Sequence, residues 1–181
     1  MPAPTVLLDT CVLINLLASD EIQSILRSAH KQVVICTAVQ AESLYLRSED
    51  TEKPSMERVD LVPLVQSGIL GVCSLDTENE ESLYVDFASQ LDDGEAMSLA
   101  LALAREFSLA TDERKARRLF VEAAKAPQRL ISTPDLMKAW SKEQKVPAPK
   151  LKETLLRIRR RARFAPPSND PGYQWWTKAC R

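Results

Sequence analysis

Short apolar segments that alternate with helical patterns constrain the fold of this chain most strongly. Five segments have the length and composition of strands, at residues 5–9, 33–37, 68–75, 108–112 and 129–133. The intervening stretches have helical patterns, at residues 10–18, 20–30, 38–47, near 55–68, and at 77–91, 92–107, 113–124 and 134–144. Such alternation is typical of a parallel sheet covered by helices. We therefore predict an α/β fold with a central parallel β-sheet flanked by α-helices.

The last 41 residues differ from the rest of the 181-residue chain in charge and pattern. Residues 1–140 contain 22 acidic and 13 basic side chains, whereas residues 141–181 contain 3 acidic and 11 basic ones. After a proline-rich connector, "LKETLLRIRRRARF" carries one apolar helical stripe formed by Leu151, Leu155, Ile158 and Ala162. The following "APPSNDPGYQWW" predicts irregular structure. We expect a domain at 1–140 and a basic helical C-terminal extension at 141–181, which binds an anionic partner or folds over the acidic body.

Several classes of protein are disfavoured by what the chain lacks. No apolar run reaches the roughly 18 residues of a membrane span, and the N-terminus has no basic leader region. The four cysteines have no CxxC spacing, which favours small buried thiols in a reducing, cytoplasmic setting. With His30 as the one histidine and no phosphate-binding glycine motif, catalytic triads and nucleotide-binding loops are disfavoured. A dehalogenase-like phosphatase would need an aspartate where Cys11 stands.

Acidic residues follow the expected strands at corresponding positions. Asp9 and Asp112 follow the first and fourth strands, Glu42 lies on the first turns of the helix after the second strand, and Glu95 begins the helix before the fourth. Since the carboxyl ends of parallel strands share one edge, these acids are expected to converge there. Converging carboxylates repel one another unless a hard cation such as Mg²⁺ or Mn²⁺ lies between them. The alternatives are helix caps at Asp9 and Asp112, a capping box of Asp92 with Glu95, and simple solvation of Glu42.

Four stretches around these acids resemble the acidic motifs of the PIN-domain nucleases, in the expected order. They are "VLLDTCVLINLL", "TAVQAES", "DDGEAMSLALALA" and "LATDERKAR", and the resemblance covers roughly residues 5–135. The later motifs resemble the prokaryotic branch that includes VapC-type toxins. The resemblance implies a PIN-like fold for residues 1–140 and places the catalytic, metal-binding acids at Asp9, Glu42, Glu95 and Asp112. One departure is Cys11, where many members have Asn or Ser.

The same resemblance implies supporting residues and an activity. Thr10 and Thr111 match hydroxyl residues that accompany the first and last acids, and Asp92 and Asp93 compete with Glu95 as the third ligand. The implied activity is Mg²⁺- or Mn²⁺-dependent hydrolysis of RNA, because bound metal activates water and stabilises charge on the phosphoryl oxygens. The implied role is the toxin ribonuclease of a type II toxin–antitoxin pair, with a cognate antitoxin and a homodimer as candidate partners. The alternative is a non-catalytic PIN-like module that binds RNA or protein.

Two groups of basic residues are candidates for RNA contact because phosphate is bound by Lys and Arg. One group follows Asp112 and the other lies in the extension; together they are Arg114, Lys115, Arg117, Arg118, Arg159, Arg160 and Arg161. Tyr173, Trp175 or Trp176 would offer rings on which bases can stack. The alternative is that these cations are solvated or pair with acidic residues of the body.

Overall fold

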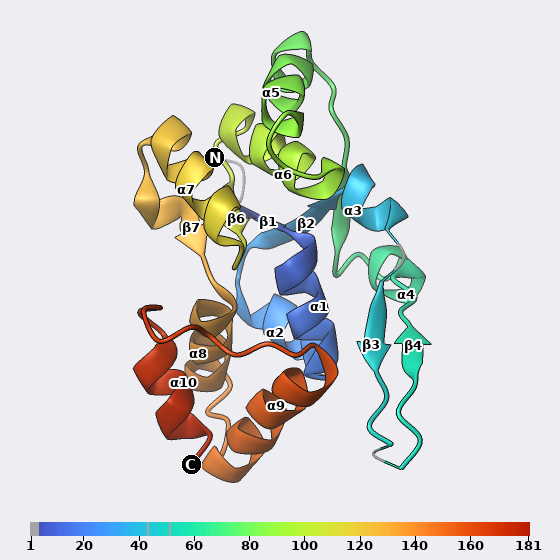
Figure 1. Cartoon of the computed structure of the whole chain (residues 1–181), viewed down its shortest axis with the longest axis vertical. Coiled ribbons are helices and arrows are strands. Elements are labelled where there is room, and N and C mark those ends of the chain that lie inside the picture. The colour runs from blue at the N-terminus through green and yellow to red at the C-terminus, as the bar shows by residue number, and fades with distance from the viewer. Residues whose placement is uncertain (1–3, 43, 51) are drawn as a thin grey trace. The chain divides into compact units, whose positions relative to one another are not determined.

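The computed structural model describes residues 4–42, 44–50 and 52–181 (Figure 1). Its described residues group into two compact units. The first, called the sheet unit, takes residues from Met1–Leu13, Lys31–Glu42 and Leu61–Ser132. The second, called the helical unit, takes residues from Ile14–His30, Ser43–Asp60 and Thr133–Arg181. Helix α1 (Thr10–Ala18) begins in the sheet unit and ends in the helical unit.

The sheet unit is built on a five-stranded, all-parallel sheet in the order β5-β2-β1-β6-β7. The strands are β1 (Thr5–Leu8), β2 (Gln32–Cys36), β5 (Gly71–Cys73), β6 (Ser108–Ala110) and β7 (Leu130–Ile131). Leu7 lies at the centre, in register with Val34 of β2 and Leu109 of β6. The predicted α/β class with a central parallel sheet is confirmed.

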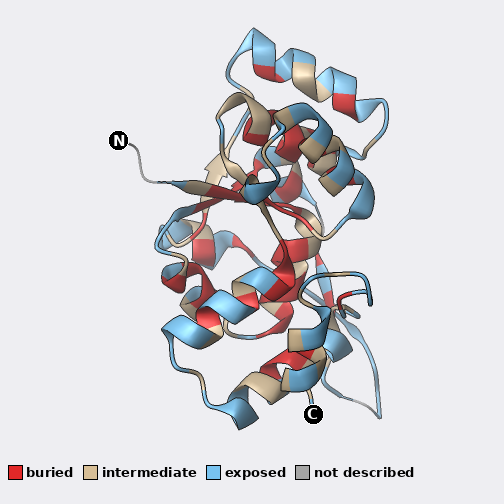
Figure 2. Ribbon diagram, turned by 90° about the vertical axis from the view of Figure 1, so that its left-hand side faces the viewer, coloured by how far each residue is buried: buried red, intermediate tan, exposed pale blue. Residues whose placement is uncertain are grey.

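Helices pack against this sheet and share the core with its strands. They are α3 (Thr37–Ala41), α4 (Val62–Gln66), α5 (Glu78–Ala88), α6 (Asp93–Ala104) and α7 (Arg114–Ala124), with a 3-10 turn at Pro127–Arg129. Helix α6 packs against β1, β2 and β6 and also against α5 and α7. Leu99 and Leu101 of α6 have no exposed surface, and Figure 2 shows this part of the unit as buried. The apolar composition of α6 on most of its faces thus reflects a central helix.

The helical unit contains α2 (Ile22–Ser28), α8 (Thr133–Glu143), α9 (Ala148–Arg161) and α10 (Tyr173–Ala179). It also holds an antiparallel pair of strands, β3 (Tyr45–Arg47) and β4 (Met56–Arg58). Leu155 and Ile158 of the predicted apolar stripe are fully buried, so α9 is the amphipathic helix expected in the basic extension. Helix α9 packs against α10 and β3.

The β3–β4 pair corrects two predicted helices. The helix predicted over 38–47 ends at Ala41, because Glu42 has an extended backbone with ψ 144° and does not lie on the first turns of a longer helix. Beyond it the burial alternates, with Leu44 and Leu46 buried and Tyr45 exposed, which is the period of a strand. The helix predicted near 55–68 shrinks to α4, since residues 56–58 pair with β3.

The C-terminal region is more ordered than its prolines indicated. The segment expected to lack regular structure includes the start of α10 at Tyr173. Trp176 is 3% exposed and packs edge-on against Phe164, with ring centroids 5.6 Å apart. Burial of these rings supplies stability that local sequence preference does not. Across the described residues, every helix is too short or too polar to cross a bilayer. The proposed boundary at residue 140 stays a prediction.

Candidate metal centre

The strand order brings two of the predicted acids to neighbouring strand ends. From β1 the chain moves to β2 and β5 on one side of the sheet, whereas β6 and β7 lie on the other side. In open parallel sheets, ligands bind beyond the carboxyl ends of the strands where the order reverses. Asp9 directly follows β1, and Thr111 and Asp112 directly follow β6. The candidate site lies at this switch point, inside the sheet unit.

Asp9 is held there as a buried carboxylate, with only 2% of its surface exposed. Its Oδ1 accepts a hydrogen bond from the Thr10 amide at 2.8 Å, and its Oδ2 accepts one from the Thr111 hydroxyl at 2.7 Å. Burial raises the pKa of Asp9, and the bonds from Thr111 and Thr10 oppose that rise. A purely capping aspartate accepts from the second or third amide of the helix. Asp9 is therefore oriented by a second strand end as well as by its own helix.

Cys11 connects the first and last acidic motifs. Its thiol donates to Asp9 Oδ2 at 3.5 Å, and its sulfur accepts from the Asp112 amide at 3.3 Å. Burial, followed by the charge of Asp9, raises the pKa of the Cys11 thiol, which stays protonated at neutral pH. A neutral thiol can donate to one acidic motif and accept from the other. Cys11 thus supplies the kind of hydrogen bonds that the Asn or Ser of other sequences could supply.

Glu42 comes from the other side of β1: it follows the short helix α3, which itself follows β2. The Thr10 hydroxyl donates to Glu42 Oε2 at 2.9 Å. The other oxygen, Oε1, lies so close to Gly94 of α6 that a Cβ there would be 2.3 Å away. Loss of hydration, together with the negative charges of Asp92 and Asp9, raises the pKa of Glu42. Thr10 and the absence of a side chain at Gly94 therefore fix where this acid lies.

The start of α6 holds the remaining acids. Asp92 caps the helix by accepting from the Glu95 amide at 2.9 Å, which is the forward half of the expected capping box. Asp93 is exposed and accepts from the Tyr84 hydroxyl at 3.1 Å. Partial burial, followed by the charges of Asp92, Asp9 and Glu113, raises the pKa of Glu95 to about 7. The acids of this edge therefore repel one another across elements that are distant in sequence.

Comparison with known proteins now decides the family. A family described as PIN domain matches residues 5–168, which is most of the chain. The chain belongs to the PIN-domain family. Neither the curated proteins nor the solved structures gave a match. PIN domains are typically nucleases and generally use divalent metals, and the match runs past the last motif found by sequence reasoning into the basic extension.

The acids of this PIN domain fit a hard cation in chemistry, since they offer only carboxylate oxygens next to neutral hydroxyl and thiol groups. In this structure, however, the acidic side chains lie apart. Among the described residues, no three His, Cys, Asp or Glu side chains converge closely enough to hold a metal ion. Asp9 is fixed by buried hydrogen bonds, whereas Glu42 is exposed and Glu95 half-buried. Burial therefore constrains the side chain of Asp9 more than those of the two glutamates.

The basic residues predicted to bind RNA have different surroundings in the two units. In the sheet unit, Arg114, Lys115 and Arg118 of α7 are exposed, whereas Arg117 donates to the Thr111 carbonyl at 2.8 Å. Arg117 therefore also braces the loop that carries Asp112. Arg118 lies 3.9 Å from Glu122 on the same helix.

In the helical unit most of the predicted arginines are paired with acids. Arg161 is 10% exposed and contacts Asp20 at 2.6 Å and Glu57 at 2.9 Å. Arg160 contacts Glu153 at 2.7 Å. Arg159 is exposed. Pairing with acidic residues of the body was the alternative interpretation of these cations. Arg161 has such partners, and Arg160 lies 3.8 Å from Glu49 of the body.

Sequence reasoning overlooked two residues at this edge. Gly94 allows Glu42 to approach α6, and a glycine inside an otherwise good helix was the available signal, since it costs about 1 kcal/mol relative to alanine. Glu113 precedes α7 and adds negative charge near Glu95. No signal marked Glu113, because its role depends on the proximity of the start of α7 to Glu95 in the folded chain.

Proposed function

We propose that this PIN domain is a metal-dependent endoribonuclease that hydrolyses RNA phosphodiester bonds. The observation that supports it most is the buried Asp9 carboxylate, held between two strand ends and linked through Thr10 to the neighbourhood of Glu42. Burying a charge is costly unless a partner compensates it. The negative charges of Asp9 and Asp92 also raise the pKa values of Glu42 and Glu95, and a bound cation would remove this repulsion.

In this proposal Asp9 and Asp112 are the firmest metal ligands, and Glu42 and Glu95 complete the site directly or through water. Bound Mg²⁺ or Mn²⁺ supplies an activated water and charge stabilisation at phosphorus. Thr10 and Thr111 orient the acids, and Asp92 caps α6 while adding negative charge. The exposed Arg114, Lys115 and Arg118 provide positive charge for the RNA backbone.

A titration with Mn²⁺ tests the proposed site. The wild-type chain is expected to bind Mn²⁺, and Asp9→Asn is expected to lose that binding without melting lower in the absence of metal. Asn keeps one oxygen that accepts from the Thr111 hydroxyl and gives up the bond from the Thr10 amide, and the lower repulsion among the acids offsets that loss. A clear loss of apo stability with unchanged metal affinity would assign Asp9 to helix capping instead.

One observation favours a second candidate, a non-catalytic PIN-like module that binds RNA or protein. Among the described residues, three acids do not converge as the chain stands. In that case the acids would serve only to shape the loops after β1 and β6. This candidate would be supported over the nuclease if the chain bound RNA but took up no Mn²⁺ at Mn²⁺ concentrations that saturate other carboxylate sites.

The biological role that we propose is the toxin of a type II toxin–antitoxin pair acting on RNA in the cytoplasm. Its support is the resemblance of the later motifs to the VapC branch, together with four free cysteines among the described residues, which suit a reducing compartment. Expression of the wild-type chain should arrest growth, and Asp9→Asn should not. Co-purification with the product of an adjacent reading frame would identify an antitoxin, and sedimentation would measure the proposed homodimer.

A further inference from the structure

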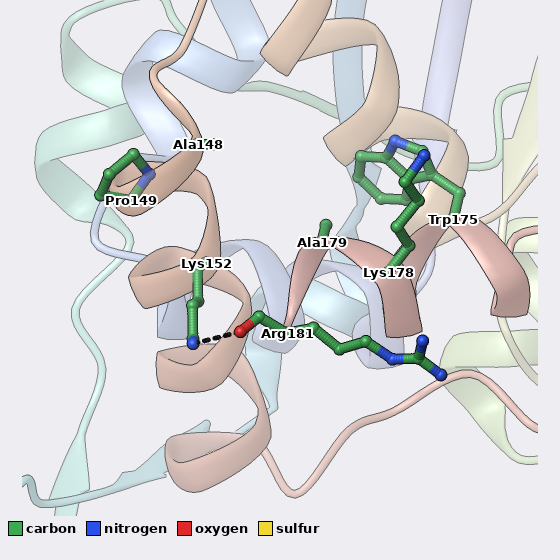
Figure 3. Close-up of a pocket in the computed structure, with 7 residues that line it drawn as sticks. All are labelled: Ala148, Pro149, Lys152, Trp175, Lys178, Ala179 and Arg181. Carbon is green, nitrogen blue, oxygen red and sulfur yellow. Dashed lines mark hydrogen bonds between the residues drawn. The ribbon is translucent and has the colours of Figure 1, made fainter.

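A groove in the helical unit combines an aromatic ring with a cluster of cations. It lies between α9 and α10, has a volume of about 570 Å³, and is drawn in Figure 3. Its apolar wall comes from Ala148 and Pro149 at the start of α9 and from Trp175 of α10. The volume lies within the range of small-ligand sites and suffices for one nucleotide. Nothing in the proposed catalytic chemistry uses this groove.

The charged residues that line the groove all carry the same sign. They are Lys152, Lys178 and Arg181, and no acidic residue lines it. Lys152 donates to the Arg181 carbonyl at 2.7 Å, which joins the end of α10 to α9 (Figure 3). The ammonium group of Lys152 keeps two further donors for a ligand. The groove is therefore complementary to an anion.

Among the described residues of the helical unit, the ion pairs leave some cations of α9 and α10 without an acidic partner. Arg157, Arg160 and Arg161 are all matched by acidic side chains. In the described part of the chain, no ion pair involves Lys178 or Arg159. Lys178 thus leaves its charge available to an anion at the groove, whereas Arg159 leaves its charge in the last turn of α9.

Trp175 is braced so that its ring can serve as a platform. It packs edge-on against Trp176, with centroids 6.4 Å apart and an interplanar angle of 72°. Trp176 is itself buried and packs against Phe164. A ring that is already ordered loses little conformational freedom when a ligand stacks on it.

We infer that this groove binds an unpaired nucleotide of a single-stranded nucleic acid, with the base against Trp175 and the phosphates at Lys152, Lys178 and Arg181. Aromatic platforms next to basic side chains are the usual means of binding single strands without sequence preference. A nucleotide accounts for both features, whereas a simple anion would leave Trp175 without a role. The inference rests on the proposed function only in taking RNA as the strand that is bound in the cell.

Binding in EDTA tests the inference apart from catalysis. The full chain is titrated against a labelled oligouridine and a matched oligothymidine, and affinity is followed by fluorescence anisotropy. Trp175→Ala is expected to weaken the binding of both strands about tenfold, because the base loses the ring on which it stacks. Lys178→Ala is expected to flatten the dependence of log affinity on log salt by about 0.7, the value for one phosphate contact on a single strand.

Two exposed residues of the helical unit that do not line the groove serve as matched controls. Tyr45→Ala removes a ring of β3, and Lys142→Ala removes a cation of α8. Both should bind like wild type. Equal losses in the controls, no loss in Trp175→Ala and Lys178→Ala, or a loss confined to one strand would overturn the inference.

Two further outcomes are distinguished, namely that Trp175→Ala fails to fold and that the groove binds a protein. If Trp175→Ala melts early, the salt dependence of Lys178→Ala decides the matter, since that residue is exposed. A glutamate-rich peptide tests for an acidic protein partner by competing with the oligonucleotide. If the peptide displaces it equally from wild type and from Trp175→Phe, and both proteins bind the oligonucleotide with the same affinity, the groove belongs to an acidic partner. That result would overturn the inference. Loss of cleavage in Asp9→Asn with intact strand binding leaves the inference standing.

Discussion

The Thr111 hydroxyl donates to Asp9 Oδ2 at 2.7 Å, joining residues that are 102 positions apart in the sequence. The contact exists because β1 and β6 are neighbours in the sheet, although six helices and four strands separate them in the sequence. It holds a buried carboxylate in one orientation at the strand switch point. The predictions below follow from the surroundings of this acid.

Thr111→Val should destabilise the chain by about 2 kcal/mol, because a buried carboxylate loses a hydrogen bond and the replacement has nearly the same volume. Chemical denaturation at neutral pH in EDTA measures the change. Thr111→Ser keeps the donor and should lose much less. Equal stability of Thr111→Val and wild type would mean that Asp9 is not held by this hydroxyl.

Gly94→Ala should separate metal binding from stability. Alanine favours the helical conformation of α6 by roughly 0.5–1 kcal/mol, which tends to stabilise the apo chain. Its Cβ would meet Glu42 Oε1 at 2.3 Å and must displace that side chain. We expect weaker Mn²⁺ binding together with an unchanged or higher melting temperature. Unchanged Mn²⁺ affinity would exclude Glu42 from the metal site.

Glu95→Gln should change the pH dependence of apo stability. The pKa of Glu95 is raised from its ordinary 4.5 to about 7, so its proton favours the folded state. That stabilising contribution is complete below pH 4.5 and is lost as the pH rises through 7. In EDTA, Glu95→Gln should therefore be more stable than wild type above pH 7, and this advantage should vanish below pH 4.5.

Saturating Mn²⁺ should reverse the order of Glu95→Gln and wild type above pH 7, since only the wild-type acid gains a cation. Glu81→Gln, an exposed acid in the first turn of α5, is the matched control for loss of one charge. If both variants show the same pH profile, Glu95 does not experience the charges of Asp9 and Asp92.

Glu80→Gln tests a structural acid of the same unit. Arg105 bonds both oxygens of this buried carboxylate, at 2.7 and 3.1 Å, and holds the pKa of Glu80 at about 2. A depressed pKa contributes stability that is present above pH 4.5 and lost as the pH falls toward 2. The variant should lose about 3 kcal/mol at pH 7 and nothing near pH 2. Urea unfolding across this range measures the difference, with Glu81→Gln as control.

The sequence predicted the parts of this molecule that local patterns encode. The parallel sheet follows from short apolar runs, and the central position of α6 follows from an apolar surface that includes Leu99 and Leu101. The first strand end was recognised from Asp9 itself. Each of these depends on residues that are close together in the chain.

What the sequence did not reveal depends on distant partners. The segment 45–47 is a strand because residues 56–58 pair with it, and α10 forms where Trp176 meets Phe164. Likewise Gly94 matters only because Glu42 approaches it, and Arg161 is occupied only because Asp20 and Glu57 lie beside it. Helix and strand preferences carry no information about such contacts.

Cleavage of a 5′-labelled RNA by the purified chain in Mn²⁺ tests the proposed nuclease most directly. Attack by water at phosphorus, without the 2′-hydroxyl as nucleophile, predicts fragments with 5′-phosphate and 3′-hydroxyl ends. Cleavage should stop in EDTA and in Asp9→Asn, whereas Lys142→Ala, which removes an exposed cation of α8, should cleave like wild type. Intact RNA with the wild-type chain in Mn²⁺, or products ending in 2′,3′-cyclic phosphate, would contradict the account.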